Sequence, residues 1–373
     1  MAAGIVLGAM EGLLEQLPGL LVLVPAAIGM RGAIFGALAA RLGTGILTGQ
    51  LQPPLRRRSF AGQNVEASIL LTLFSSALAA LAARGLSGAL GIPTIGLFEL
   101  MVISVVGGVL SSVVILAGVL LMASLAQRRG WDMDAIGAPL VTTSGDIVTL
   151  PALVLATLLI GNEIVVGVVG GLLLAAAVYA VASGARNEGP ITRRIVQESI
   201  PVLTYAAIVD ILAGGVLETR VEALITNPAL LVLIPPFIAN CGSLGGILSA
   251  RLGTELHLGM IAPRVVPEKL AVLEGSLTLL FSIAAFGGVG LIAHVAGLVF
   301  GFDSPGLATM LGIALVGGGI ALGLLFAVAY TTASAAFRFG WDPDNHGIPV
   351  VTATMDFFGV LCLVAAMALF GVV

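Results

Sequence analysis

The stretch "WDMDAIGAPLVTTSGDIVTL", from Trp131 to Leu150, carries Asp146 into a long apolar segment. The stretch "WDPDNHGIPVVTATMDFFGV", from Trp341 to Val360, does the same with Asp356. A carboxylate buried among apolar side chains is costly unless it is paired or binds an ion. The fold must therefore accommodate two such acids, each placed behind a similar run of residues.

The composition around these stretches is that of a membrane protein. The chain has 373 residues, of which 58% are hydrophobic and 10% are charged, and its mean hydropathy is +1.14. Soluble domains carry about 25% charged residues. Apolar segments long enough to cross a bilayer recur along the chain, which predicts an all-α polytopic membrane protein. We expect the lipid bilayer as a partner, with no nucleic acid, no cofactor and no disulfide framework from Cys241 and Cys362.

A constant shift of 210 in residue number, as from Asp146 to Asp356, carries much of the first half of the sequence onto the second half. This shift is called the repeat shift below. The positions that it matches are Pro25/Pro235, Gly32/Gly242, Gly36/Gly246, Arg41/Arg251, Gly43/Gly253, Pro53/Pro263, Gly107/Gly317, Trp131/Trp341, Pro139/Pro349, Thr142/Thr352 and Asp146/Asp356. The register holds without net insertion, so the chain is a tandem duplication. We predict a membrane repeat over 1–161, a linker helix and loop over 162–197, and a second membrane repeat over 198–373.

Each copy is expected to contain five helices, with one extra helix between the copies. The predicted ranges are 1–15 (short), 19–49, 63–84, 97–127 and 138–161, then the linker helix 164–184, then 198–217, 229–259, 273–298, 306–337 and 348–372. The first helix of copy one is shorter than its counterpart, which leaves two readings, a truncated helix or a natural start upstream.

The extra helix determines the orientation of the copies. Five spans reverse the side on which the chain emerges, so a sixth crossing lets both copies face the same way. We expect about 11 spans, a pseudo-twofold axis along the membrane normal and a pore at the interface of the two parallel repeats.

The basic residues agree with this arrangement. With the N-terminus in the cytoplasm, eleven of the 16 Lys and Arg fall in cytoplasmic loops, whereas Arg84 and Arg220 fall outside. The positive-inside rule favours this orientation. The expected location is the plasma membrane, and the duplicated chain is expected to function as a monomer.

Asp146 and Asp356 are the main site candidates. Each is expected near the middle of the bilayer, where a carboxylate costs roughly 2.5–3.5 kcal/mol. Two facing carboxylates repel unless one is protonated or a cation lies between them. Thr142 and Thr352, one helical turn earlier, add neutral oxygen atoms, and an all-oxygen set suits Mg²⁺ or Ca²⁺. The alternative is a structural hydrogen bond of each acid across a helix pair.

Four further acids precede these helices. Asp132, Asp134, Asp342 and Asp344 are expected in the cytoplasmic loops, where they either shape a turn or helix start or form an acidic mouth that concentrates cations.

Polar residues also occur in the second helix of each copy. Asn240 and Ser243 are expected to interrupt the long helix after Pro235 and to line the pathway. Arg31 in the first copy would oppose a cation, so we expect it to point elsewhere or to pair with an acid.

The two opening stretches resemble the start of the fifth membrane helix in the MgtE family of magnesium transporters, in particular its two-repeat branch, which includes animal solute-carrier magnesium transporters. The stretch "PFIANCGSLGGILSARLGTELHLG", residues 236–259, is similar to the second helix of that family. The resemblance implies a transported Mg²⁺ ion, a pore acid at Asp146 and Asp356, an acid near the mouth at Asp132 and Asp342, and carbonyl ligands at Thr142 and Thr352. The chain departs from the family pattern at Ala33 and Ser243, where an Asn is common.

The sequence therefore predicts a divalent cation transporter rather than an enzyme, with Mg²⁺ favoured. A carrier coupled to Na⁺ or H⁺ that moves Mn²⁺, Co²⁺ or Zn²⁺ is the alternative. Two acids in separate membrane helices also occur in intramembrane aspartyl proteases, but Thr143 and Met355 depart from that pattern. A membrane scaffold that transports nothing is a third hypothesis.

Overall fold

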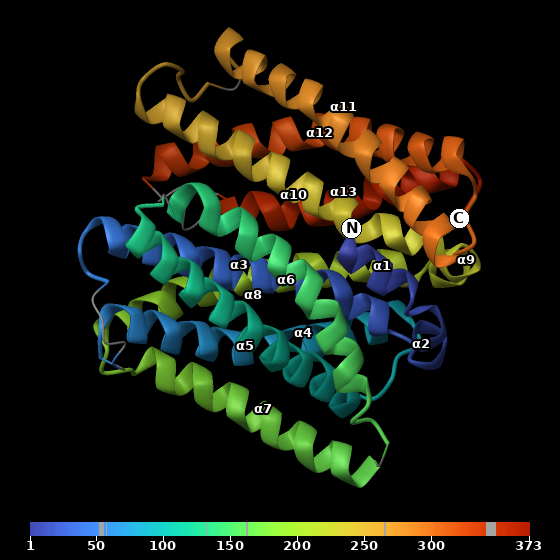
Figure 1. The fold of residues 1–373 in the computed structure, drawn as a ribbon, viewed down its shortest axis with the longest axis horizontal. Coiled ribbons are helices and arrows are strands. Elements are labelled where there is room, and N and C mark those ends of the chain that lie inside the picture. Colours follow the sequence, from blue (N-terminus) through green and yellow to red (C-terminus); the bar gives the residue numbers. More distant parts are fainter. Residues whose placement is uncertain (52–55, 57, 132, 162, 265, 341–347) are drawn as a thin grey trace. The chain divides into compact units, whose positions relative to one another are not determined.

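The computed structural model describes residues 1–51, 56, 58–131, 133–161, 163–264, 266–340 and 348–373, without the side chains of 133–139, 142 and 348. All regular structure in this part of the chain is helical (Figure 1). The helices are α1 (Ala2–Gly8), α2 (Glu11–Gln16), α3 (Leu20–Leu47), α4 (Phe60–Leu90), α5 (Leu97–Arg129), α6 (Met133–Thr157), α7 (Glu163–Ala185), α8 (Pro190–Glu218), α9 (Val221–Thr226), α10 (Pro228–His257), α11 (Lys269–Phe300), α12 (Leu307–Phe339) and α13 (Ile348–Leu369).

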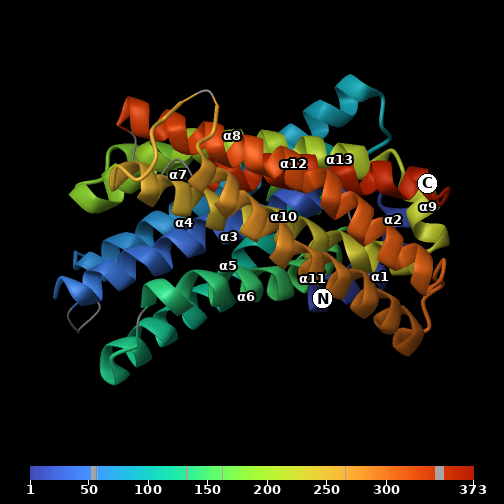
Figure 2. The ribbon, with the colours of Figure 1, turned by 90° about the horizontal axis from the view of Figure 1, so that it is seen from above.

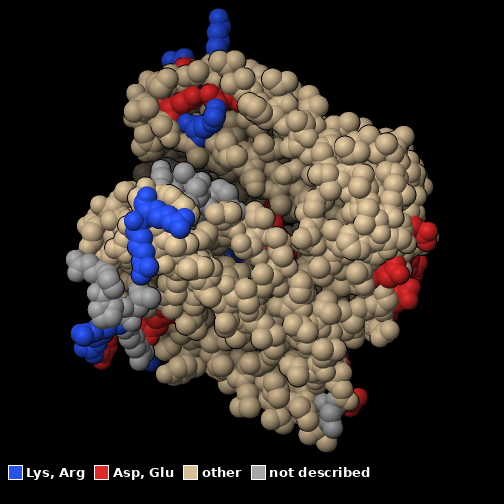
Figure 3. Space-filling view, in the orientation of Figure 1, with Lys and Arg blue, Asp and Glu red and all other residues tan. Residues whose placement is uncertain are grey.

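The expected multi-pass membrane protein is confirmed. Among the described residues, nine helices are long and apolar enough to cross a membrane, namely α3, α4, α5, α7, α8, α10, α11, α12 and α13. In α6 the range Thr143–Thr157 is a shorter apolar helix. The expected number of about 11 spans stays a prediction. Figure 3 agrees with the membrane setting, because charged residues occupy only small groups on the face that it shows.

Two compact units make up the chain. The first-repeat unit is Pro18–Ile211, and the second-repeat unit is Met1–Leu17 together with Leu212–Val373. In the second-repeat unit α1 crosses α10 so closely at Gly4 that any side chain there would meet the backbone of Val232. The short N-terminal helices thus pack on the second copy. Most of α8 belongs to the first-repeat unit, where Ile195, Val196 and Leu203 join its apolar core.

Within each unit the long helices pack side by side. In the first-repeat unit α6 packs against both α3 and α5, and α7 packs on α4 and α5 (Figures 1 and 2). In the second-repeat unit α10, α12 and α13 contact one another, and α11 covers α10 and α12. Matching pairs of helices are therefore in contact in the two units, as the duplication predicts.

Glycines end the long helices at matching positions. Gly49 and Gly259, Gly91 and Gly301, and Gly130 and Gly340 have φ values of 70° and 70°, 68° and 73°, and 68° and 65°. The repeat shift relates the two members of each pair, and this left-handed conformation favours glycine because it lacks a Cβ atom. The duplication is thus present in the backbone as well as in the sequence.

The expected interruption of the second helix is wrong for the second copy. The helix α10 runs without a break from Pro228 to His257, through Pro235, Pro236 and the glycines that follow. Pro228 occupies the first turn, where a missing N–H is tolerated. The two interior prolines lie among fully buried neighbours such as Leu233 and Phe237, whose packing retains the helix despite the lost hydrogen bonds.

Helix starts also differ from the prediction. The helix α8 begins at Pro190 instead of residue 198, because Gln63 of α4 accepts a hydrogen bond from the Ile191 N–H at 3.1 Å and so caps its first turn. The helix α6 begins at Met133, so Asp134 lies in its first turn and not in a loop. Asp132, Asp342 and Asp344 lie outside the described residues.

Candidate functional site

Asp356 of α13 lies against α10 at Gly242. A Cβ atom at Gly242 would stand 2.9 Å from Oδ1 of Asp356 and 3.8 Å from both Cβ and the carbonyl oxygen of Thr352. Gly242 is buried, whereas Asp356 and Thr352 are half-buried. The glycine is therefore what allows the carboxylate and the threonine to approach the neighbouring helix.

Thr352 and Asp356 lie on one face of α13, one turn apart. The Thr352 hydroxyl donates to the carbonyl oxygen of Pro349 at 3.1 Å, so its own lone pairs remain available as acceptors. Thr354 makes a similar bond, from its hydroxyl to the carbonyl oxygen of Val350 at 2.6 Å. In the second-repeat unit the structure thus brings Asp356, Thr352 and the backbone of Gly242 together.

The other polar candidates of the second copy lie on α10 beside Gly242. Asn240 is half-buried and Ser243 is exposed, whereas Cys241 between them is fully buried. The sulfur of Cys241 would stand 3.0 Å from a Cβ atom at Gly359, one turn beyond Asp356 on α13. Cys241 therefore belongs to the helix contact, while Asn240 and Ser243 point away from the buried core.

Asp146 occupies the middle of α6 in the first-repeat unit. It is the fourteenth residue of a 25-residue helix and is half-buried. The residue before it, Gly145, faces α3 and α5, because a Cβ atom there would stand 3.8 Å from Cβ of Arg31 and from Cδ1 of Ile115. The side chain of Thr142 lies outside the described part of the chain. Asp146 and Asp356 belong to different units, and each is placed here within its own.

The guanidinium of Arg31 lies against α4 and α5, in keeping with one of its two expected arrangements. Its side chain is 1% exposed, and Nη2 donates a hydrogen bond of 2.5 Å to the hydroxyl of Ser76 on α4. The guanidinium also lies on Gly108 of α5, where a Cβ atom would stand 2.5 Å from Nη2. A buried arginine in an apolar segment is visible in the sequence, but its partners on α4 and α5 are not.

A hydrogen bond from an arginine occurs at equivalent positions within each of the two units. Arg41 Nε donates to Oδ1 of Asn64 at 2.8 Å, and at the equivalent position of the second copy Arg251 Nη1 donates to Oε2 of Glu274 at 2.7 Å. Both arginines therefore join the second and third helices of their copy through hydrogen bonds.

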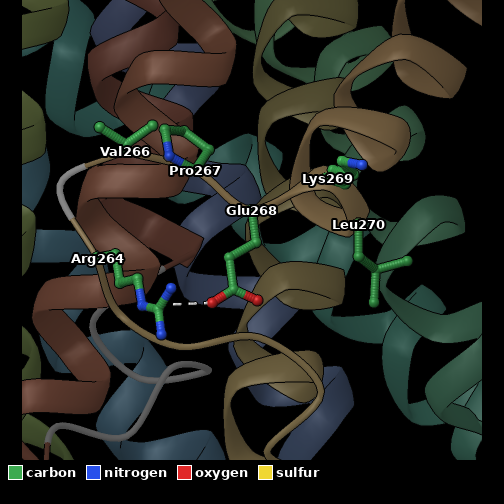
Figure 4. Close-up of a pocket in the computed structure, with 6 residues that line it drawn as sticks. All are labelled: Arg264, Val266, Pro267, Glu268, Lys269 and Leu270. Carbon is green, nitrogen blue, oxygen red and sulfur yellow. Dashed lines mark ion pairs between the residues drawn. The ribbon is translucent and has the colours of Figure 1, made fainter.

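The described residues contain no group of three or more His, Cys, Asp or Glu side chains that could hold a metal ion. A surface hollow in the second-repeat unit is lined by Arg264, Val266, Pro267, Glu268, Lys269 and Leu270. Figure 4 shows the Arg264 guanidinium turned toward Glu268, with Nε 3.5 Å from Oε1. This ion pair neutralises part of the hollow, and none of the expected site residues lines it.

A multi-pass helical protein with two related copies, each with an acid inside an apolar helix, is the kind of protein that moves ions across membranes. The family model described as a divalent cation transporter, MgtE, matches residues 24–156 and again 234–366. Together the two matches cover more than half of the chain, and the repeat shift carries the first match onto the second. The chain therefore belongs to the MgtE divalent cation transporter family, as its sequence motifs predicted.

Similar curated proteins include animal solute carriers. Solute carrier family 41 member 2 of Gallus gallus is 26% identical over 374 residues, which are 92% of this chain and 62% of that protein. The human member 2 is 25% identical over 372 residues, with the same coverage of both chains. Member 3 of Mus musculus is 23% identical over 375 residues, which are 94% of this chain and 75% of that protein. The chain thus spans about three fifths of these two member 2 proteins. No solved structure matches it.

Proposed function

We propose that the chain transports divalent cations, Mg²⁺ above all, through a pathway whose central ligands are Asp146 and Asp356. Thr142 and Thr352 add oxygen atoms one turn earlier. The observation that carries the proposal is the position of Asp356, a carboxylate halfway along an apolar helix that is seated on a glycine of the neighbouring helix. Membership of a family of divalent cation transporters favours this function over proteolysis or a scaffold role.

The chemistry of the proposed ligands suits a hard cation. Carboxylate, hydroxyl and carbonyl oxygens are the ligands that Mg²⁺ and Ca²⁺ take in proteins. Because Mg²⁺ gives up its water reluctantly, a site with few protein ligands fits an ion that keeps most of its hydration shell. A cation between two carboxylates also removes the repulsion that the pair would otherwise suffer.

The proposed topology has about 11 spans with the two repeats parallel and the N-terminus in the cytoplasm, in the plasma membrane. The pathway then runs along the pseudo-twofold axis between the repeats, and a single chain suffices. Asp132, Asp134, Asp342 and Asp344 form the cytoplasmic mouth, and Asn240 and Ser243 line the pathway. Their carboxylates and amide would attract and pass cations without holding them tightly.

Flux into liposomes tests the proposal. The purified full-length chain is reconstituted, and Mg²⁺ entry is followed with an internal Mg²⁺-sensitive dye. Asp146→Asn and Asp356→Asn should each reduce entry sharply, and the double variant should abolish it. Asp303→Asn is the matched control, because Asp303 is an exposed acid in the loop between α11 and α12. Undiminished entry through the double variant would refute the proposed site.

The same liposomes distinguish the modes of transport. Entry driven by a membrane potential alone is expected of a channel, whereas a need for an imposed Na⁺ or proton gradient identifies a coupled carrier. Competition with Mn²⁺, Co²⁺ and Zn²⁺ ranks the cations. Mg²⁺ entry that these ions block completely at equal concentration would contradict a preference for Mg²⁺.

A further inference from the structure

Arg31 is a buried cation whose charge is only partly compensated. Nη2 has the Ser76 hydroxyl as its partner, but Nε and Nη1 have no hydrogen-bond partner in the part of the chain that the structure describes. The residue is 1% exposed, so bulk water does not solvate these groups. No ion pair between Arg31 and a described carboxylate cancels the charge. Such a group is costly to bury, and its field is weakly screened.

The second copy shows that the fold does not need a charge at this place. The residues that correspond to Arg31, Ser76 and Gly108 are Cys241, Phe286 and Gly318. There the ring of Phe286 lies on Gly318 and packs against Phe237, with ring centroids 4.8 Å apart. In the second copy the Phe286 ring therefore lies on α12 at the place that corresponds to the position of the Arg31 guanidinium on α5 in the first copy. Because an apolar filling of the same fold exists, packing does not explain Arg31.

The position of Arg31 connects it with the proposed cation ligand of its own copy. Helices α3 and α6 are in extensive contact, and Cβ of Arg31 would be 3.8 Å from a Cβ atom at Gly145, the residue before Asp146. The next residue, Gly32, corresponds to Gly242, which faces Asp356 in the second copy. The Arg31 side chain is thus anchored beside the point where α3 meets the acid-bearing segment of α6, and its guanidinium extends from there to Ser76 on α4 and Gly108 on α5.

We propose that Arg31 is a fixed positive charge that weakens cation binding at Asp146, so that the first-repeat acid holds the ion less tightly than Asp356 does. The proposal rests on the proposed function, since it assumes that Asp146 binds the transported cation. A cation near the ligand repels a divalent ion twice as strongly as a monovalent one at the same distance. The asymmetry supplies a weak and a strong half-site, and conduction requires an ion to leave as well as to enter.

Two substitutions distinguish an effect of the Arg31 charge from an effect of its side-chain shape. Arg31→Met removes the charge and keeps a long side chain, whereas Arg31→Lys keeps the charge. In liposomes Arg31→Met should lower the Mg²⁺ concentration at half-maximal flux by about tenfold or more, and should lower the maximal rate as release slows. Arg31→Lys should stay within about twofold of the parent chain in both quantities.

A third variant, the packing transplant, gives the first copy the side chains of the second copy. The second copy shows that these side chains pack in the same fold. The double substitution Arg31→Cys with Ser76→Phe copies Cys241 and Phe286, and it should reproduce the tighter Mg²⁺ dependence of Arg31→Met. A readout without flux is the rise in Tm that Mg²⁺ causes in detergent, which should begin at a lower Mg²⁺ concentration in both neutral variants.

Three results would overturn the inference. The first is an unchanged half-maximal concentration in both neutral variants. The second is an Arg31→Lys chain that behaves like Arg31→Met, which would mean that shape matters and not charge. The third is a looser Mg²⁺ dependence in the transplant. Asp146→Asn distinguishes these from failure of the proposed function: if it leaves flux intact, the site itself is wrong, whereas lost flux with indifferent Arg31 variants refutes only the inference.

Discussion

Oδ1 of Asp356 lies 2.9 Å from the point where a side chain on Gly242 would begin. The carboxylate and the glycine belong to different helices of the second-repeat unit, α13 and α10, and the contact places Thr352 against the same stretch of α10. The position of the Asp356 carboxylate therefore depends on the distance between α10 and α13. Its position should therefore respond to any change in that spacing.

A side chain at Gly242 is expected to displace the Asp356 carboxylate. Gly242→Ala places a methyl group closer to Oδ1 than ordinary contact allows, so either the carboxylate or the helix must move. Overpacking of this kind costs about 1–3 kcal/mol, and a shift of about 1.4 kcal/mol in ion binding is tenfold in affinity. We expect half-maximal Mg²⁺ flux at an approximately tenfold higher concentration in the reconstituted variant.

The control for this prediction is Gly323→Ala on α12, where a Cβ atom would have nothing within 4 Å. That variant should transport like the parent chain. Normal Mg²⁺ dependence in Gly242→Ala would mean that the position of the Asp356 carboxylate has no influence on transport.

A comparison of two threonines of α13 distinguishes a proposed ion ligand from a threonine that only forms a hydrogen bond within its helix. The hydroxyls of Thr352 and Thr354 both donate to carbonyl oxygens of the preceding turn, at 3.1 and 2.6 Å. Only Thr352 lies one turn before Asp356 on the same face. Thr352→Ala should therefore weaken the apparent Mg²⁺ affinity by about tenfold or more, on the scale of a hydrogen bond to a charged group, about 1.5–3 kcal/mol. Thr354→Ala should leave it unchanged.

Thr352→Ser sharpens the comparison, because it retains the hydroxyl and should restore the affinity. Flux titrations of the three variants with Mg²⁺ provide the measurement. Equal affinities in Thr352→Ala and the parent chain would leave the backbone carbonyl as the sole contribution of this residue.

Much of the fold could be predicted because hydrophobicity and repetition are explicit in the sequence. The long helices, the linker helix and the pairing of Asp146 with Asp356 as equivalent positions follow from apolar length and from the repeat shift. The family follows from the same stretches. The continuous course of α10 through Pro235 and Pro236 could not be predicted, since the buried packing that retains the helix comes from distant residues such as Phe286.

The residue types of the candidate site are readable from the sequence, but their contacts are not. Asp356 and Thr352 stand out in the sequence as polar residues in an apolar helix. Their neighbour Gly242 also repeats, but a glycine in a sequence does not reveal which side chain approaches it. The direction of the Arg31 guanidinium likewise depends on Ser76 and Gly108, which lie on two other helices.

Adjacent glycines of α12 test the aromatic packing of the second copy. A Cβ atom at Gly318 would run into the ring of Phe286, whereas one at Gly319 would meet nothing within 4 Å. Gly318→Ala should therefore destabilise the protein by about 1–3 kcal/mol through overpacking. Gly319→Ala should be neutral or stabilising by up to about 1 kcal/mol, because alanine favours the helix. Thermal unfolding in detergent compares the two, and equal Tm values would contradict the Phe286 contact.

The pair of Arg251 with Glu274 offers a final test of the equivalence of the copies. In the first copy the hydrogen-bond partner of the corresponding Arg41 is the neutral amide of Asn64, and the charge of Glu198 also acts on Arg41. Glu274→Gln keeps an acceptor and should cost less than about 1 kcal/mol, because Arg251 is 56% exposed and such pairs are weak. Glu274→Ala removes the acceptor and should lower Tm further, as should Asn64→Ala in the first copy. Equal losses for Glu274→Gln and Glu274→Ala would show that the charge of Glu274 matters more than its hydrogen bond, and that the two contacts differ in kind despite their common register.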